Sequence, residues 1–190
     1  MKTQFGIVAI SLAALTLGGC GKKDEPIRND TAGAPVNSMN AVDQAPVAES
    51  AGQAFANAAA ASDAFEIQSS QLAQANSGSA AVKKFAAAMV KAHTDSTAKL
   101  NQAASSASPA IVPSPVLTAE QQQMLGALKA KTGADFDAAY IQAQTKAHQE
   151  TLDKLKAYST SGDVPVLKEF ATKLIPIVTG HLNMAKGLKS

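Results

Sequence analysis

The sequence predicts an all-α protein, an up-down-up-down four-helix bundle with a short extra helix before the third long helix. Composition is the first reason, because the chain is rich in alanine, the best helix former, and poor in strand-favouring aromatics, with six Phe, two Tyr and no Trp. The second reason is that apolar residues recur at three- and four-residue steps over four long stretches. The third is that most breaks between these stretches are short, which favours antiparallel neighbours.

The first twenty residues predict export and lipidation rather than a part of the fold. Lys2 precedes an apolar run, Phe5–Leu17. As a helix this run would reach only about 20 Å, short of a hydrocarbon core of about 30 Å, so residues 1–19 are expected to be a lipoprotein signal peptide. Leu17-Gly18-Gly19-Cys20 resembles the bacterial lipobox, and Cys20 is the only cysteine. We therefore expect a lipid anchor on Cys20 that holds the protein on a membrane. The alternative is an ordinary secreted protein with a free thiol.

Residues 20–45 are expected to form a disordered tether behind this anchor. The stretch is polar, contains Pro26 and Pro35, and shows no sustained apolar period. Gly21 stands where an Asp would resemble the inner-membrane retention signal, so we expect the outer membrane of the cell envelope. The folded domain, residues 46–190, would then lie in the periplasm. One cysteine cannot form an internal disulfide, so packing must stabilise this domain.

Two long helices are predicted in the first half of the domain. The first covers about 46–76 and ends at Ser77-Gly78-Ser79, and the second covers about 80–107. Each long helix of the bundle is expected to direct at least one Phe inward. Prolines at 109, 113 and 115 then prevent the helix from continuing, and they predict the longest loop inside the domain.

A short helix and a long helix are predicted next. Thr118 and Gln121 have the spacing of a capping box that opens the short helix. Gly133 interrupts the pattern, and the long helix follows over Asp135–Tyr158. Within it, two aromatic residues one turn apart, at 136 and 140, are expected to pack together.

The last predicted helix covers about 164–188 and has the most regular apolar stripe in the chain. We expect Asp163 to cap its N-terminus, with Pro165 tolerated in the first turn. Pro176 lies inside the helix and should bend it, because proline removes one backbone hydrogen bond and crowds the preceding turn.

Several of these residues together resemble a known family. They are Met89-Val90 before His93-Thr94, then Phe136-Asp137 and Tyr140 with His148-Gln149-Glu150 downstream, and Pro176 followed by His181-Leu182. In this order and spacing they resemble the bacterial envelope domain of unknown function 4142, over about Gln53 to Leu188. The resemblance implies a ferritin-like fold and a predicted outer-membrane protein, and it brings no established activity. Members often carry an acidic residue before the histidine of the second helix, where this chain has Ala92.

Four residues are candidates for a metal site: Glu66, His93, His148 and His181. Each falls on or beside the apolar stripe of a different predicted helix, so the bundle would direct all four toward its core. Imidazole and carboxylate ligands suit zinc, copper, iron or nickel. No Glu-x-x-His pair is present, so the carboxylate-rich diiron centre of ferritin-like proteins is not expected. A single transition metal ion held by two or three of the histidines stays open.

The other interpretation is that the histidines only pack in the core. Each ring would then lie against apolar neighbours and bond one nitrogen to a hydroxyl, a carboxylate or water. The candidate partners are Ser62, Ser96, Thr97, Glu150 and Thr151. In this case the domain would work through a surface, and its partner would be another envelope protein or the cell wall.

The sequence does not favour an enzyme. It contains no G-x-S-x-G, H-E-x-x-H, P-loop, C-x-x-C-H or glycine-rich dinucleotide pattern. A net charge of +2 without a basic cluster argues against nucleic-acid binding. We therefore expect a membrane-anchored envelope lipoprotein with a binding or scaffolding role and no cofactor. The alternative is a metal-binding bundle for storage, buffering or stress protection.

Overall fold

The structure is a computed structural model that describes residues 49–189, and all of its long elements are helices. The described part of the chain contains five of them: α1 (Ala51–Asn76), α2 (Ala80–Ser105), α3 (Ala119–Lys129), α4 (Gly133–Ser161) and α5 (Pro165–Gly187). This confirms the predicted all-α class and the short extra helix before the third long one. The expected signal peptide, the lipidated Cys20 and the tether over 20–45 lie outside the described residues.

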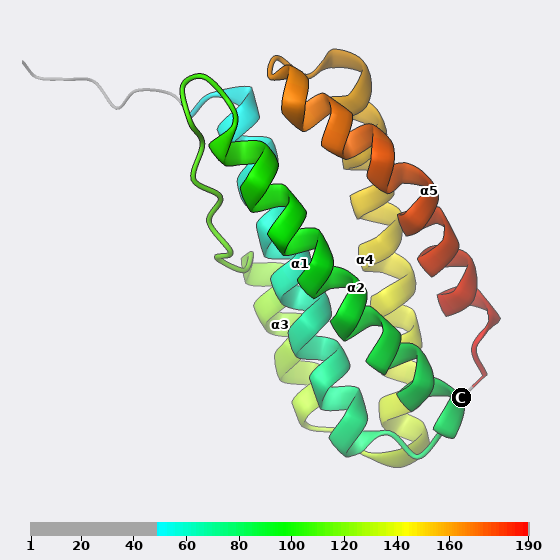
Figure 1. Ribbon diagram of the computed structural model, residues 1–190. Coiled ribbons are helices and arrows are strands. Elements are labelled where there is room, and N and C mark those ends of the chain that lie inside the picture. Colours follow the sequence, from blue (N-terminus) through cyan, green and yellow to red (C-terminus); the bar gives the residue numbers. More distant parts are fainter. Residues whose placement is uncertain (1–48, 190) are drawn as a thin grey trace, which may run out of the picture. The chain divides into compact units, whose positions relative to one another are not determined.

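The four long helices form two antiparallel hairpins that pack side by side (Figure 1). The first hairpin is α1 with α2 and the second is α4 with α5; α1 also contacts α4, and α2 contacts α5. The short helix α3 lies outside this ring, against α1 and α4. Every pair of neighbouring long helices is therefore antiparallel.

The direction of the third long helix differs from the up-down-up-down prediction. The end of α2, the end of α4 and the starts of α1 and α5 meet in one apolar cluster, so α2 and α4 run in the same direction. The reason is the segment 106–129, which returns along the bundle as a proline-containing loop and then α3 (Figure 1). Successive helices alternate in direction along the whole bundle only when the short helix α3 is counted as one of them. One long crossover is also a feature of ferritin-like bundles.

Side-chain caps begin three of the helices. Ser50, Ser79 and Thr118 accept hydrogen bonds from backbone N–H groups in the first turns of α1, α2 and α3, and Thr118 forms the predicted capping box with Gln121. The prediction for Asp163 was wrong. The N-cap of α5 is Val164, and Asp163 instead accepts a hydrogen bond from the Tyr158 hydroxyl at 3.0 Å.

The turn between α3 and α4 depends on Gly133. Its φ is +59°, in the left-handed region that favours glycine, and it is the first residue of α4. The long helix therefore begins two residues before the predicted Asp135. Pro176 lies inside α5, which runs without interruption from Pro165 to Gly187.

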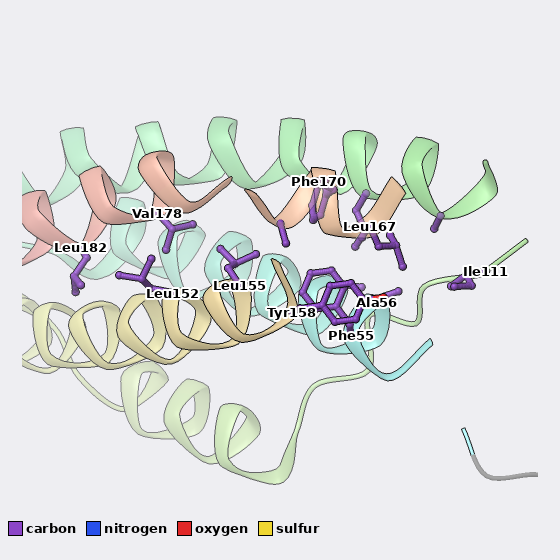
Figure 2. Close-up of a cluster of buried hydrophobic side chains, with 14 residues drawn as sticks. Phe55, Ala56, Ile111, Leu152, Leu155, Tyr158, Leu167, Phe170, Val178 and Leu182 are labelled. Carbon is purple, nitrogen blue, oxygen red and sulfur yellow. The ribbon is translucent and has the colours of Figure 1, made fainter. Parts of the chain in front are cut away.

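The apolar core has two separate parts, and the first lies at the end of the bundle where α1 and α5 begin (Figure 2). Phe55 stacks on Tyr158 with ring centroids 3.9 Å apart and an interplanar angle of 8°. Phe170 meets Phe55 edge-on at 6.5 Å. Three helices therefore meet through aromatic rings at this end.

The second apolar cluster fills the opposite end of the bundle. Phe65, Met89, Phe136 and Tyr140 are fully buried there. The Phe136 and Tyr140 rings stack with centroids 5.8 Å apart, as predicted for aromatic residues one turn apart. Between the two clusters, each of α1, α2 and α4 buries charged or polar side chains instead of apolar ones.

Within residues 49–189, no helix combines the length and the apolar content needed to cross a membrane.

Candidate metal site

Three histidines from three different helices meet in the polar layer. His93 of α2, His148 of α4 and His181 of α5 each place one ring nitrogen within 4.8 Å of those of the other two. Their ring centroids are 5.5 to 5.7 Å apart, and the rings are tilted or perpendicular rather than stacked. His93 and His148 are buried and His181 is half-buried. The bundle thus brings together all three histidines of the chain.

The helical period explains why the three rings converge. His93 lies one turn after buried Met89, and His148 directly follows Ala147 on the buried stripe of α4. His181 lies three residues after Val178 and one before Leu182, both buried. Each histidine therefore faces the interior at the level where the two apolar clusters separate.

His93 is held by a carboxylate from α1. Its Nδ1 lies 2.8 Å from Oδ1 of Asp63, and both side chains are buried. The Thr97 hydroxyl donates to the other carboxylate oxygen, Oδ2, at 3.2 Å. Because a carboxylate oxygen accepts the hydrogen bond, His93 donates through Nδ1, and a neutral ring in this arrangement carries its lone pair on Nε2.

His148 is held by the backbone of its own helix. Its Nδ1 donates to the carbonyl oxygen of Gln144 at 2.9 Å, which again leaves the lone pair on Nε2. Burial lowers the pKa of His148, although the Gln144 carbonyl acts in the opposite direction. His148 is therefore neutral at pH 7 and can serve as a ligand.

His181 completes the group from the half-buried side. Burial, together with smaller effects of the neighbouring His93 and His148, lowers the pKa of His181 to about 4. The ring is therefore neutral at pH 7. Its Nδ1 is buried and has no hydrogen-bond partner among residues 49–189.

Three imidazole nitrogens in this layer lack any partner in the described part of the chain: Nε2 of His93, Nε2 of His148 and Nδ1 of His181. A buried polar atom without a partner is costly, and lone pairs that approach one another also repel. A metal ion bound to all three would remove both costs at once. The packing interpretation asks for one bonded nitrogen in each ring, and His93 and His148 have it through Nδ1, whereas no residue in 49–189 bonds the second nitrogen of either ring.

Glu66 of α1 lies beside the histidines but outside their group. Its Oε1 is 3.4 Å from Nδ1 of His148, the nitrogen that already donates to Gln144, and both carboxylate oxygens lack hydrogen-bond partners among residues 49–189. Burial raises the pKa of Glu66 to about 7, against the lowering effects of His93 and the Gln144 side chain. Glu66 therefore lies on the Nδ1 side of the candidate ligand His148 and is not one of the three grouped ligands.

The donor set fits a first-row transition metal ion. Neutral imidazole suits zinc, copper and nickel, and a carboxylate behind a ligating histidine fixes its orientation and raises its basicity. Nitrogens bound tetrahedrally to zinc would be about 3.3 Å apart, so ring movements of about 1 Å or less bring the group to bonding distance. A divalent ion would also balance the buried charge of Asp63.

Sequence reasoning missed Asp63 and Gln144, which orient the two buried histidines. Asp63 is three residues before Glu66, one turn away on the same buried face of α1, and this spacing was a usable signal. Gln144 acts through its backbone carbonyl, which no residue pattern reports. Of the expected partners, Ser62 bonds to Thr151 and Glu150 to Lys146, so neither serves the histidines.

These features define a class of protein, the helical-bundle domain with a cluster of three histidines in its central polar layer. The chain belongs to the family described as Domain of unknown function (DUF4142), whose family model matches residues 37–188. This confirms the resemblance drawn from the motifs around His93, His148 and His181. Neither the curated proteins nor the solved structures contained a match. The ferritin-like relationship stays a prediction.

Proposed function

We propose that this domain binds a single divalent transition metal ion, zinc or copper, through His93, His148 and His181. The observation that carries the proposal is the convergence of three histidines whose ring nitrogens lie within 4.8 Å of one another, each ring having one buried nitrogen without a hydrogen-bond partner among residues 49–189. Two of the rings are already held in the tautomer that a ligand needs. Buffering or storage fits better than catalysis, since no catalytic motif accompanies the site.

Metal selectivity follows from the ligand type. Three imidazoles without a thiolate or thioether favour zinc(II), copper(II) or nickel(II), and affinity for such a site follows the Irving–Williams order. We therefore expect copper(II) to bind more tightly than zinc(II), while availability decides which ion is carried.

Calorimetric titration tests this function directly. The full-length protein carrying Cys20→Ala is used, because that change removes the only thiol and leaves the histidines as the strongest remaining ligands. We expect one zinc ion per chain at micromolar concentration. His181→Ala should abolish binding, and its half-buried position makes it the mildest of the three substitutions for the fold.

Two results would contradict the proposal. One is the absence of binding heat at micromolar zinc and copper for a protein with native helical circular dichroism. The other is unchanged one-to-one binding by the variant in which His93, His148 and His181 are all replaced by Gln, which keeps the polarity of the layer.

We also propose that the protein is anchored to the outer membrane through lipidated Cys20, with the bundle in the periplasm. The support is the lipobox-like Leu17-Gly18-Gly19-Cys20 and the Gly at position 21. Metabolic labelling with a radioactive fatty acid should mark the wild-type protein and not Cys20→Ala. Label that persists in the variant, or a wild-type protein without label, would contradict lipidation.

A further inference from the structure

The outward side of α5 is exposed along most of its length (Figure 1). This helix packs mainly against α4 and α2, whereas α3 lies against α1 and α4. Ile177 and Met184 lie two turns apart on the outward side and are 44% and 49% exposed. Gly180 lies between them and has no atom within 4 Å of an added Cβ. We refer to these three residues as the α5 strip, and a flat surface can reach both of its apolar side chains together.

Lysines lie at both ends of the α5 strip. Between them, the twelve residues Leu174–Ala185 contain no Asp, Glu, Lys or Arg. Lys173 precedes this stretch, and Lys186 and Lys189 follow it; all three are exposed. Exposed apolar side chains with lysines beside them favour contact with a membrane surface, because the apolar groups leave water while the ammonium groups stay hydrated near the headgroups.

The positive charge of the domain gathers on the same side of the bundle. The neighbouring helices α2 and α5, taken to the end of the described chain, carry eight lysines against two acidic residues. Both acids are paired within their own helix, Asp95 with Lys91 at 2.7 Å and Glu169 with Lys173 at 2.6 Å. The other described residues carry five lysines against nine acidic residues. The small net charge of the chain hides this asymmetry, which arises only when α2 and α5 pack side by side.

The chain enters the bundle beside the start of α5. The first two turns of α1 and α5 meet through Phe55 and Phe170, whose ring centroids are 6.5 Å apart. Residues 21–48 join this end of the bundle to Cys20, the proposed site of the lipid anchor. This length of chain spans at most about 100 Å, so the anchor keeps α5 within reach of the membrane.

We propose that α5 docks on a membrane surface that contains anionic lipid. The apolar side chains of the α5 strip enter the headgroup region, and the flanking lysines approach the lipid phosphates. Two half-exposed apolar side chains give weak binding alone, so the anchor at Cys20 contributes by raising the local concentration. The contact goes beyond the anchor because it fixes the orientation of the bundle, with α5 toward the lipid.

Flotation with lipid vesicles tests this contact. The chain from residue 20 onward is used with Cys20→Ala, which removes the lipidation site, and without residues 1–19, whose apolar run would itself bind lipid. This protein should float with vesicles of equal parts phosphatidylcholine and phosphatidylglycerol at low salt and lose most of the binding at high salt. Vesicles of phosphatidylcholine alone should bind it at least about ten-fold more weakly.

Charge reversal beside the α5 strip should weaken binding. Lys186→Glu with Lys189→Glu should lower the affinity for the anionic vesicles at least about ten-fold, because each lysine near such a surface contributes about a factor of five. The matched control, Lys129→Glu with Lys131→Glu, makes the same charge change at exposed positions at the end of α3 and just after it. This control should have a much smaller effect.

The apolar part of the contact has its own pair of variants. Met184→Asp places a charge within the α5 strip and should weaken binding several-fold. Val112→Asp makes the same kind of change at a 78% exposed apolar residue outside α5 and should leave binding nearly unchanged. Circular dichroism verifies the fold of each variant.

Three results would overturn the proposal. One is the absence of binding to the anionic vesicles at low salt. Another is an equal loss for the α5 and α3 pairs of lysine variants, which would leave only attraction by net charge. The third is a dimer in sedimentation that Met184→Asp dissociates, without vesicle binding, which would assign the α5 strip to a second copy of the chain. Because the tested protein carries no lipid, none of these results depends on lipidation of Cys20.

Discussion

The Nδ1 atom of His93 lies 2.8 Å from Oδ1 of Asp63, and this buried pair joins two helices of the first hairpin through the candidate site. Both carboxylate oxygens are used, because Thr97 donates to Oδ2. The pair orients the imidazole, selects its tautomer and places a negative charge behind the proposed ion. Asp63 is therefore a positioning residue whose effect should appear in metal affinity.

Asp63→Asn should weaken zinc binding by about 10- to 100-fold, the usual cost of losing a group that orients a ligating histidine. The amide can also donate to Nδ1, which would move the ring proton to Nε2 and block the ligand. Competition titration with a chromophoric chelator measures the change. Asp153→Asn, at an exposed position of α4, is the matched control and should keep the wild-type affinity. Equal affinities for both variants would remove the assigned role of Asp63.

Zinc should stabilise the domain against heat. A ligand that binds only the folded state at a hundred times its Kd adds about 2.7 kcal/mol, which raises Tm by several degrees for a domain of this size. Differential scanning calorimetry with and without zinc measures the shift. His181→Ala should lose the shift, and an equal shift in that variant would place the zinc elsewhere.

Glu66 should make the metal-free domain less stable as pH rises. The pKa of Glu66 is about 7 in the folded state, above its ordinary value of 4.5, so between these pH values the folded state holds a proton that the unfolded state has released. Protonated Glu66 contributes at most about 3 kcal/mol to the free energy of unfolding. This contribution is complete below about pH 4.5 and is lost as pH rises through about 7. The lowered pKa values of His148 and His181 act in the opposite direction below about pH 6.5.

Glu66→Gln isolates this effect, since the histidines titrate in both proteins. Urea unfolding in the presence of a chelator should show the variant gaining stability relative to the wild type between pH 5 and pH 8. The control Glu169→Gln changes an exposed carboxylate paired with Lys173 and should show little change in this difference. A constant difference between Glu66→Gln and the wild type would mean that Glu66 is not protonated in the fold.

The second apolar cluster should depend strongly on Phe65, which is fully buried. Phe65→Ala removes a large ring from the core and should lower the free energy of unfolding by about 3–5 kcal/mol. Val112→Ala is the contrasting change, because Val112 is 78% exposed and should cost almost nothing. Urea denaturation of the two variants checks both values, and a small loss for Phe65→Ala would contradict the described packing.

Two glycines should respond in opposite ways to alanine. Gly126 lies inside α3 with no atom within 4 Å of an added Cβ, so Gly126→Ala should stabilise the domain by about 0.5–1 kcal/mol. Gly133 also has open space but a φ of +59°, so Gly133→Ala should destabilise it by about 1–2 kcal/mol. Thermal unfolding of both variants measures the difference, and a stabilising Gly133→Ala would contradict the left-handed turn.

The sequence by itself determined the helices, since each is encoded by residues close to one another. Apolar period, the Thr118 capping box and the break at Gly133 were all readable without tertiary information. The three histidines were also readable, because each falls on a buried stripe of its own helix. Asp163 was misassigned because its oxygen accepts a hydrogen bond from Tyr158 instead of capping α5.

Only the tertiary structure decided which helices face one another and what orients the site. The segment 106–129 returns along the bundle, so α2 and α4 run in the same direction, and no local pattern specifies such a crossover. The Asp63–His93 pair joins residues thirty positions apart, and Gln144 acts through a backbone oxygen. Local periodicity shows which side of a helix is buried, whereas packing decides which buried atoms meet.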